Sequence, residues 1–332
     1  MIAETADAHS LVLQAPEGST DRFDYRPGQF LTLKLPGTDG SAVARCYSLA
    51  SSPHTGEPMK VTVKRVAGGY GSNWVCDHLA AGDEVEVLPP AGTFTPQSLD
   101  RDLLLVAGGS GITPVLSIAK SALVTGQGRL VLLYANRDEA SVIFRDELRA
   151  LAQDFPDRLV VIHWLESLQG LPLADRLTAA FAPYAAGREA FLCGPQPMMD
   201  AAEQALRALG APGDRIHRER FFSLGADVFD APPAVETADG EDGSTARVEL
   251  DGETHTVRWP SRTPLLDVLL AAGVDAPYSC REGACSACTC RVVTGEVKML
   301  RNDVLDEQDV AEGYVLACQS VPLTDQVEIT YS

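Results

Sequence analysis

Hydrophobic and polar positions alternate along the first hundred residues of the chain. Short segments such as QFLTLKL (29–35), KVTVKRV (60–66) and DEVEVL (83–88) place apolar side chains at every second position, and Gly and Pro turns separate them. A period of two is typical of strands with one buried face. We therefore expect residues 1–99 to form an antiparallel β domain, most simply a small barrel.

From Asp102 onward the pattern changes to continuous apolar runs with helical segments between them. Buried parallel strands require such runs, and an alternation of strand and helix is typical of a doubly wound parallel-sheet nucleotide-binding domain, here over residues 100–228. The runs are LLLVAGG (103–109), RLVLLYAN (129–136), LVVIHWL (159–165) and EAFLCG (189–194), and the helical patterns are SVIFRDELRALAQDF (141–155) and PMMDAAEQALRALG (197–210).

The segment FDAPPAVETADGEDGS (229–244) has no apolar period and is rich in Pro, Gly and acidic residues. Such a composition predicts an inter-domain linker. After it, TARVELDGETHTVRW (245–259) predicts a β-hairpin with LDGE as its turn, and TPLLDVLLAAG (263–273) predicts a helix that Gly273 ends. Residues 245–332 are therefore expected to form a separate domain.

The charge of the chain changes this picture in one respect. The 332 residues carry a net charge of -19, which disfavours binding to nucleic acid or to an anionic membrane. Residues 229–332 hold 19 acidic and 7 basic residues, a net of -12, so the first 228 residues carry only -7. This acidity indicates either a docking surface for a basic partner or a solvated face, and the sequence leaves both open.

No apolar stretch reaches the roughly 18 residues of a membrane span, and the opening MIAETADAHS has neither the basic segment nor the apolar run of a signal peptide. We therefore expect a cytoplasmic protein.

The last domain contains a dense group of cysteines in YSCREGACSACTC (278–290). Cys280, Cys285 and Cys288 follow the spacing C-x4-C-x2-C, and Cys318 lies far downstream, which is the plant-type ferredoxin arrangement for a [2Fe-2S] cluster. Disulfides are disfavoured without an export signal, and zinc would need a second short-spaced pair. We predict these four cysteines as cluster ligands and Cys290, outside the spacing, as a packed thiol on the next strand.

A one-electron carrier beside a nicotinamide domain requires a flavin, which accepts a hydride and releases single electrons. RCYSLASSP (45–53) supplies Arg45 for the flavin pyrophosphate, Tyr47 for the isoalloxazine face and Ser48 for its polar edge. An exposed strand end without a ligand would have a similar sequence.

A second flavin candidate is VKRVAGGYGSNW (63–74), in which Gly71, Ser72 and Asn73 would begin a helix with free N–H groups for phosphate. A plain turn before a helix is the alternative.

Two further motifs suit a nicotinamide coenzyme. The glycines of AGGSGITP (107–114) allow a pyrophosphate to approach the backbone, with Thr113 and Pro114 where nicotinamide meets flavin. FLCGPQPMM (191–199) places Cys193 at the carboxyl edge of the sheet, although a buried structural thiol would also fit.

The segment YANRDEAS (134–141) contains residues that suit either NADH or NADPH, so the choice between the two coenzymes stays open. There Arg137 suits a 2′-phosphate and Asp138 a ribose hydroxyl.

The segments RCYS, GGYGSNW, GGSGITP and CGPQPM, in this order, resemble the ferredoxin–NADP reductase-like flavoproteins. With its carboxyl-terminal plant-type ferredoxin domain, expected to have the β-grasp fold, the chain resembles reductase components of multicomponent oxygenases over essentially its whole length. RCYSLASSP, HWLESLQGLP and CREGACSACTC resemble the reductases of 3-ketosteroid 9α-hydroxylases, and phenylacetyl-CoA epoxidase reductases have the same layout. The resemblance implies electron flow from NADH, with NADPH possible, through FAD and the cluster to a Rieske-type terminal oxygenase.

The resemblance also implies roles for individual residues. Ser48, Thr113 and Cys193 would lie at the reacting centre, and which of Phe221 and Phe222 faces the flavin is left open. The implied flavin contacts are Arg45, Cys46, Tyr47, Ser48, Lys64, Arg65, Gly71, Ser72, Glu219 and Phe221, and the implied coenzyme contacts are Gly109, Thr113, Tyr134, Arg137, Cys193, Gly194 and Pro195.

Other partners and one other function class fit the same sequence. None of the six histidines has a metal-ligand neighbour, so a partner must hold the oxygen-activating centre. That partner is alternatively a di-iron phenylacetyl-CoA epoxidase or an acyl desaturase. A redox sensor without turnover is disfavoured, because every motif for hydride entry and electron exit is present. The acids expected to dock the partner are Glu282, Asp303, Asp306 and Glu307.

Overall fold

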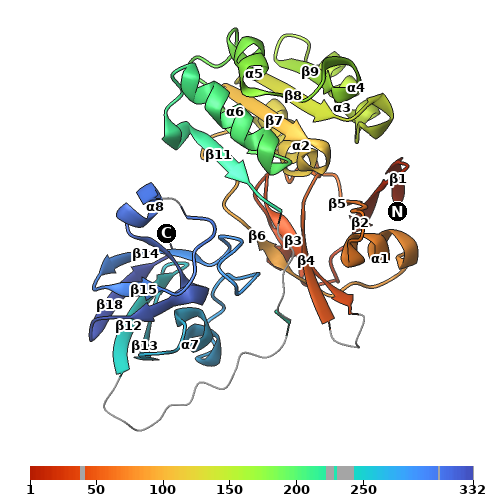
Figure 1. The fold of residues 1–332 in the computed structure, drawn as a ribbon. Helices are drawn as coiled ribbons and strands as arrows, with labels where there is room; N and C mark the ends of the chain where they lie inside the picture. The colour runs from red at the N-terminus through yellow and green to blue at the C-terminus, as the bar shows by residue number, and fades with distance from the viewer. Residues whose placement is uncertain (38–41, 222–227, 230–242, 306, 332) are drawn as a thin grey trace. The chain divides into compact units, whose positions relative to one another are not determined.

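The computed structural model describes residues 1–37, 42–221, 228–229, 243–305 and 307–331 (Figure 1). They divide into two compact units, one of residues 1–33 and 46–221, and one of residues 34–45 with the described part of 222–332. Most of the expected linker, 230–242, lies outside the described residues. Among the helices that the structure describes, none has the length and apolar character needed to cross a membrane.

The first hundred residues form two three-stranded sheets, as their alternating pattern predicts. The pairings β1–β2, β2–β5 and β3–β6 are antiparallel, and an isolated bridge joins Leu49 to Val61. The expected barrel domain is thus assembled from two small sheets with one helix, α1. The sheets are β1 (Ile2–Thr5), β2 (Ala8–Leu13) and β5 (Met59–Lys64), and β4 (Ala42–Ser48), β3 (Phe30–Pro36) and β6 (Val87–Ala91); α1 spans Tyr70–His78 and a 3-10 turn, η1, spans Thr20–Phe23.

The strand expected over DEVEVL begins later than the pattern predicts. Asp83 to Glu86 have no strand structure, and β6 starts at Val87. The Asp83 carboxylate accepts a hydrogen bond from the Ala80 N–H at 2.8 Å, which holds the chain in a turn at this point. The prediction for residues 83–86 was therefore wrong, because a local side-chain bond competes with strand pairing.

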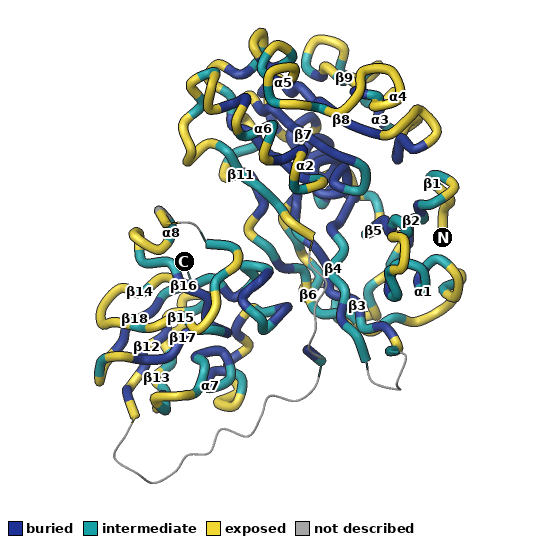
Figure 2. The backbone as a smooth tube through the Cα atoms, in the orientation of Figure 1, coloured by how far each residue is buried: buried dark blue, intermediate teal, exposed yellow. Residues whose placement is uncertain are grey.

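The nucleotide-binding domain has a parallel sheet in the order β11-β10-β7-β8-β9. Helices cover both faces: α2 and α3 pack in one core cluster, and α5 and α6 in another. The central strands β7 and β8 are buried along their whole length, which Figure 2 shows as dark blue. The doubly wound fold is confirmed. The strands are β7 (Leu103–Gly108), β8 (Leu130–Asn136), β9 (Leu159–Leu165), β10 (Glu189–Cys193) and β11 (Ile216–Glu219), and the helices are α2 (Ile112–Thr125), α3 (Arg145–Asp154), α4 (Glu166–Gln169), α5 (Ala174–Phe181) and α6 (Gln196–Ala208), with 3-10 turns η2 (Gly109–Gly111), η3 (Glu139–Ser141) and η4 (Gly213–Arg215).

Helix α3 starts four residues later than its apolar period predicts. Asp138 caps the short turn η3, and its carboxylate accepts from the Ser141 N–H at 2.9 Å. Phe144 then adopts φ 58°, a left-handed conformation that cannot continue a helix, so α3 begins at Arg145. The capping bond uses the Asp138 carboxylate that the sequence also suggested for a ribose hydroxyl.

The barrel and the nucleotide-binding domain share one hydrophobic core within the first unit. Ala8, Ala50 and Phe94 belong to the same buried cluster as the apolar residues of α2. The ring of Phe94 meets that of Phe191 on β10 edge-to-face, with 5.3 Å between centroids. These contacts position the first two domains against each other.

The carboxyl-terminal domain has the expected hairpin and helix. β12 pairs antiparallel with β13 across Asp251 and Gly252, both with positive φ, as a two-residue Asp-Gly turn requires. Helix α7 (Leu265–Ala271) is followed by Gly273, φ 77°, and the Gly273 and Val274 N–H groups bond back to the Leu270 and Leu269 carbonyls.

One five-stranded sheet and α7 enclose the core of this domain, the arrangement of a β-grasp fold. The sheet order is β13-β12-β18-β14-β16, with β15-β17 as a separate pair. The elements are β12 (Gly243–Leu250), β13 (Glu253–Pro260), α7 (Leu265–Ala271), β14 (Thr289–Thr294), β15 (Val297–Met299), α8 (Glu307–Ala311), β16 (Tyr314–Leu316), η5 (Ala317–Gln319), β17 (Ser320–Pro322) and β18 (Gln326–Thr330).

Candidate functional site

The four predicted cluster cysteines come together in the carboxyl-terminal domain. The Cys280 N–H lies 3.3 Å from the Cys285 sulfur, and the Cys318 N–H lies 3.4 Å from the Cys288 sulfur. The Cys280 sulfur interacts with the thiols of both Cys285 and Cys318, which connects the two pairs. In the described residues no three His, Cys, Asp or Glu side chains meet as closely as a single metal ion requires. The sulfurs form a contiguous chain instead.

The loop that carries these cysteines directs backbone N–H groups at sulfur. The Glu282 and Ala284 N–H groups donate to the Cys280 sulfur at 3.4 and 3.3 Å. Together with the neighbouring thiols, these donors lower the pKa of Cys280 well below its usual value. Thiolates are the ligands of iron–sulfur clusters, so the donor set and its surroundings fit a [2Fe-2S] cluster.

Neighbouring elements fix the conformation of the cluster loop. Arg281 and Ser286 both have φ 56°, and a side chain on Gly283 would come within 3.0 Å of the Arg301 carbonyl oxygen. The Arg281 guanidinium pairs with Asp267 of α7 at 2.6 Å, and the Gln319 amide donates to the Arg281 carbonyl at 3.0 Å. The loop is thereby fastened both to α7 and to the segment of the last cysteine.

Cys290 is separate from this set, as predicted. It lies on β14, it is 2% exposed, and its thiol faces the Val315 carbonyl at 3.8 Å. The prediction of a packed thiol on the following strand is confirmed.

The first flavin candidate occupies the end of β4. Cys46 and Ser48 alternate with Arg45 and Tyr47, so the two pairs face opposite sides of the strand. Ser48 is buried, while the other three are partly buried. The structure thus places Arg45 and Tyr47 on one face of the strand. Ser48 is on the opposite face, so it could contact the same flavin only at the end of the strand.

The second flavin candidate is a turn whose side chains hold its own backbone. The Val66 N–H donates to the Ser72 hydroxyl at 3.1 Å, and the Asn73 amide donates to the Gly69 carbonyl at 2.6 Å. Helix α1 begins at Tyr70, one residue before the predicted start at Gly71, and Gly71 is buried in its first turn. Arg65 pairs with Asp77 on the same helix at 2.6 Å. The hydrogen bonds fix the shape of this turn, and the flavin contacts predicted for Arg65, Gly71 and Ser72 remain predictions.

The glycine turn after β7 packs directly against the end of β10. A side chain on Gly111 would lie 2.1 Å from the Cys193 carbonyl oxygen, and one on Gly194 would lie 2.9 Å from the Gly108 Cα atom. β7 and β10 are neighbours at the position where the strand order reverses, which is where ligands bind in such sheets. Glycine is required at both positions because the turn and the strand end pack backbone against backbone.

Tyr134 supports this turn from behind. Its ring is fully buried on β8, and its hydroxyl donates to the Gly109 carbonyl at 3.0 Å. The same hydroxyl accepts from the Ile143 N–H at 3.3 Å. The structure gives Tyr134 a supporting position, and its direct coenzyme contact remains a prediction.

Arg137 follows the end of β8 and forms an ion pair that sequence reasoning missed. Its guanidinium lies 3.0 Å from the Asp7 carboxylate, and the Lys64 ammonium lies 3.8 Å from the same group. Asp7 comes from the turn between β1 and β2, so no local sequence signal connects it with Arg137. The attraction of Arg137 for a 2′-phosphate is reduced by this pairing.

Asn136 is a second residue that the sequence analysis did not single out. It is 7% exposed at the carboxyl end of β8; the Tyr134 hydroxyl is close enough to interact with its side chain, but neither polar atom of the amide makes a hydrogen bond of full geometry within the described residues. A buried amide without partners is costly, and a ligand that bonds to it removes that cost. The Asn136 amide and the glycine turn both lie at the carboxyl ends of the parallel strands, and together they fit a coenzyme bound there. The sequence signal that could have identified Asn136 is its position as a polar residue at the end of an apolar strand.

Cys193 and Glu219 are register partners at the ends of β10 and β11. Glu219 is partly buried, and desolvation raises the pKa of its carboxyl to about 8, while full burial together with Glu219 raises the pKa of the Cys193 thiol. The Cys193 thiol is therefore neutral near pH 7. Phe221 is 48% exposed, and Phe222 lies outside the described residues. Which of the two faces the flavin therefore stays open.

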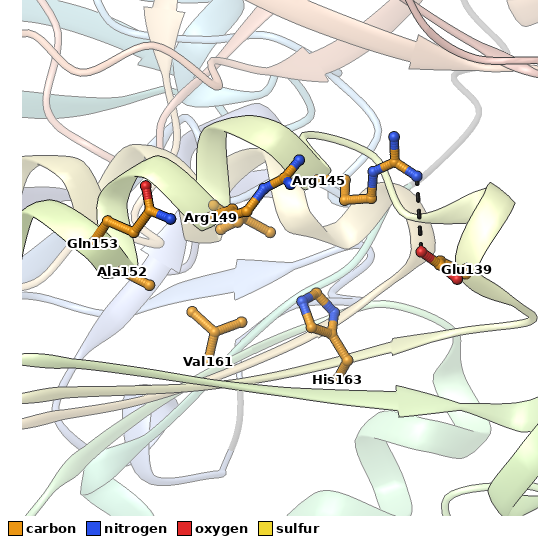
Figure 3. Close-up of a pocket in the computed structure, with 8 residues that line it drawn as sticks. Glu139, Arg145, Arg149, Ala152, Gln153, Val161 and His163 are labelled. Atoms are coloured by element: carbon orange, nitrogen blue, oxygen red, sulfur yellow. Dashed lines mark ion pairs between the residues drawn. The ribbon is translucent and has the colours of Figure 1, made fainter. Parts of the chain in front are cut away.

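A surface hollow of about 660 Å³ lies between α3 and β9 (Figure 3). It is lined by none of the predicted site residues. Arg145 and Arg149, its two arginines, both pair with Asp146, and Arg145 also lies 3.9 Å from Glu139. Burial lowers the pKa of His163 on its floor. The cationic groups of this hollow are already matched by acids of the same segment.

Three family models match the chain in sequence order. The oxidoreductase FAD-binding domain matches residues 3–95, the oxidoreductase NAD-binding domain residues 105–204, and the 2Fe-2S iron-sulfur cluster binding domain residues 248–323. The chain therefore has the three domains that its motifs predicted, and its cofactors are a flavin, a nicotinamide coenzyme and a [2Fe-2S] cluster.

Whole-length relatives have the same layout. The chain is 56% identical to the 3-ketosteroid-9-alpha-monooxygenase ferredoxin reductase component of Rhodococcus rhodochrous, over 100% of this chain and 95% of the relative. It is 36% identical to one component of the Escherichia coli 1,2-phenylacetyl-CoA epoxidase, over 99% and 95% of the two chains. In structure it is similar to phthalate dioxygenase reductase, with a TM-score of 0.57, 26% identity, and coverage of 99% of this chain and 95% of that one.

Proposed function

We propose a function from the premise that the chain belongs to the family of flavin- and [2Fe-2S]-containing ferredoxin reductase components of multicomponent monooxygenases. Within that family we propose that it is the reductase of a 3-ketosteroid 9α-hydroxylase, which takes electrons from NADH and delivers them to a Rieske-type terminal oxygenase. The observation that carries the proposal is the 56% identity over the whole chain. The cytoplasmic location expected from the sequence remains a prediction.

In this function the first unit prepares the transfer from coenzyme to flavin. Bound together, nicotinamide and flavin exchange a hydride, and the flavin then releases its electrons one at a time. Thr113, 2% exposed, donates from its hydroxyl to the Ser110 carbonyl at 3.0 Å and so stiffens the glycine turn. Cys193, 1% exposed and kept neutral by burial, supplies a dry, uncharged wall at the carboxyl edge. Both residues exclude water from the place where the hydride moves.

The carboxyl-terminal domain prepares the exit of single electrons. Cys280, Cys285, Cys288 and Cys318 would hold the cluster, and the N–H groups directed at the Cys280 sulfur favour its thiolate. Hydrogen bonds to the sulfurs of such a cluster also raise its reduction potential, which favours uptake of an electron.

The proposal is tested by reconstitution. Purified chain, NADH and a 3-ketosteroid substrate are combined with the Rieske oxygenase of a steroid hydroxylase, or with a di-iron epoxidase and its own substrate. We expect coupled product formation with the first partner. Product with the epoxidase alone would transfer the assignment to that class. NADH oxidation without electron delivery to either partner would contradict the reductase function proposed here.

The coenzyme preference gives a separate prediction. Since Arg137 is held by Asp7 at 3.0 Å, we expect NADH to be the preferred coenzyme. Asp7→Asn should release Arg137 and improve kcat/KM for NADPH by roughly tenfold, the value of one charged hydrogen bond. Arg137→Ala should change kcat/KM for NADH little. A large loss with NADH in a folded Arg137→Ala protein would show that Arg137 binds a group common to both coenzymes.

Docking of the oxygenase gives a prediction on salt. The net charge of -12 on residues 229–332 supports a basic partner face. Of the candidate acids, Asp303 pairs with Arg301 at 2.5 Å, Glu307 is exposed, and Asp306 lies outside the described residues. Because screening shortens to about 3 Å at 1 M salt, electron delivery to the oxygenase should slow by about tenfold or more from low to high salt.

Stopped-flow absorbance across a salt series measures this effect. Flavin reduction by NADH, followed in the same samples, is the internal control and should change much less. A flat inter-protein rate with folded protein would assign the acidity to solubility alone.

A further inference from the structure

A buried lysine joins the barrel to the nucleotide-binding domain within the first unit. Lys120 lies on α2, and its side chain is only 5% exposed. Its ammonium group is 2.6 Å from a Glu57 carboxylate oxygen and 2.8 Å from a Glu147 carboxylate oxygen. Glu57 belongs to the barrel loop before β5, whereas Glu147 belongs to α3. One cation is therefore shared between the two domains.

A second lysine completes this cluster from the barrel side. Lys60 on β5 pairs with the other oxygen of Glu147 at 2.9 Å, and its ammonium lies 4.8 Å from the centre of the Phe144 ring. Burial alone raises the pKa of the Glu147 carboxyl, and the two lysines lower it below its ordinary value. Two lysines and two glutamates thus balance in charge at the domain interface.

Hydroxyl groups extend the same contact along α2. The Ser117 hydroxyl donates to the Ser51 carbonyl at 2.6 Å, and the Ser121 and Ser52 hydroxyls are 2.8 Å apart. Positions 117, 120 and 121 lie four, seven and eight residues after Thr113, which places all of them on one face of the helix. The face that carries Thr113 at its start is therefore the face that docks on the barrel.

The barrel loop that contacts Lys120 directly follows the strand that carries the flavin candidates. The loop of residues 49–58 follows β4, with Tyr47 and Ser48, and leads into β5, which carries Lys60 and ends at Lys64. The Glu57 carboxylate also accepts from the Ser52 N–H at 2.9 Å, so the loop is rigid where it meets Lys120. About 10.5 Å of helix separates Lys120 from Thr113, at 1.5 Å per residue.

We propose that Lys120 is a positioning residue for hydride transfer: by holding α2 between Glu57 and Glu147, it sets the placement of the nicotinamide turn relative to the flavin strand. Buried ion pairs contribute little net stability but can select one arrangement of packed elements. Hydride transfer depends steeply on such placement, since a displacement of 1 Å can cost about 100-fold in rate. The proposal rests on the flavin and nicotinamide steps of the function proposed above.

The test compares three variants of the holoenzyme in stopped-flow reduction of the flavin at saturating NADH. Lys120→Met removes the charge at similar length and should slow flavin reduction by about 10- to 100-fold. Lys120→Arg should retain most of the rate. Arg158→Met is the matched control, because Arg158 bonds to the Ala122 and Leu123 carbonyls of the same helix and makes no contact with the barrel among the described hydrogen bonds. Its rate should stay near that of the unmodified protein.

Two further readouts distinguish positioning from simple loss of structure. Hydrogen exchange of peptides 51–60 and 112–125 should quicken in Lys120→Met and not in the barrel core. The long-wavelength absorbance of stacked nicotinamide and flavin, obtained on adding NAD⁺ to the reduced protein, should weaken. If Lys120→Met does not fold, Glu57→Gln leaves Lys120 paired with Glu147 and should still slow flavin reduction several-fold.

An unchanged rate in folded Lys120→Met or Glu57→Gln would overturn the proposal, as would equal slowing in Arg158→Met. The failure of the unmodified protein to accept a hydride from NADH would instead contradict the proposed function. The two failures are therefore distinguishable.

Discussion

Cys285→Ser is expected to abolish cytochrome c reduction by NADH while ferricyanide reduction continues. Cys285 supplies one of the four sulfurs of the contiguous chain, next to Cys280. Loss of a partner that only supports a ligand already lowers metal affinity about 10- to 100-fold, so loss of a ligand should lower cytochrome c activity by about 100-fold or more. Ferricyanide can accept electrons directly from a flavin, a step that does not need the cluster.

Cys290→Ser is the matched control for this experiment. Cys290 lies on the strand that leaves the cluster loop, is buried, and stands outside the ligand spacing. It should retain the cluster absorbance and most of the cytochrome c activity. Iron, acid-labile sulfide and FAD are measured in both variants. Equal loss of both activities in a Cys285→Ser protein that retains FAD would exclude a linear path from flavin to cluster.

Gly111→Ala is expected to disable the entry of the hydride. The new methyl group would lie 2.1 Å from the Cys193 carbonyl oxygen and 2.7 Å from the Gly194 nitrogen, and neither backbone atom can yield without moving β10. Overpacking of this kind costs about 1–3 kcal/mol of folding free energy. The displaced turn should also slow flavin reduction by NADH by about 100-fold, because we predict that the coenzyme binds at that turn.

Gly187→Ala separates this clash from the ordinary effect of replacing a glycine. Gly187 lies in the same domain, has φ 75°, and offers open space to a methyl group. It should lose stability through backbone strain and leave flavin reduction unchanged. Thermal unfolding and stopped-flow reduction are measured for both proteins. Normal flavin reduction in Gly111→Ala would mean that the turn does not hold the coenzyme.

The hydrophobic pattern predicted every strand of the parallel sheet from β7 to β10, because a buried parallel strand must be apolar on both faces. It was less accurate where polar side chains act on the backbone. Asp83 and Asp138 each bond to a nearby N–H group, and these bonds delay β6 and α3 relative to their apolar periods. Such local competition is not visible in a pattern of apolar positions.

The candidate site divides in a similar way. Cysteine spacing predicted the four cluster ligands, because a compact cluster admits few loop lengths between its first three ligands. The glycines at 109, 111 and 194 were recognisable from their motifs: at 111 and 194 neighbouring backbone leaves no room for a side chain, and at 109 the positive φ of 53° favours glycine. The ion pairs of Asp7 with Arg137 and of Glu57 with Lys120 join residues 130 and 63 positions apart, and nothing in either local segment indicates its partner.

By itself the sequence determined the order of domains and the parallel sheet and predicted the four cysteines as cluster ligands, since these follow from periodicity and spacing within short segments. Only the tertiary structure decided that Tyr134 supports the glycine turn, that the buried Asn136 amide makes no hydrogen bond of full geometry among the described residues, and that Lys120 is shared between two domains. The physical reason is that the energy of a buried polar group depends on which distant groups surround it after folding. The sequence shows the polarity of each residue, but it does not show which distant residues surround that residue after folding.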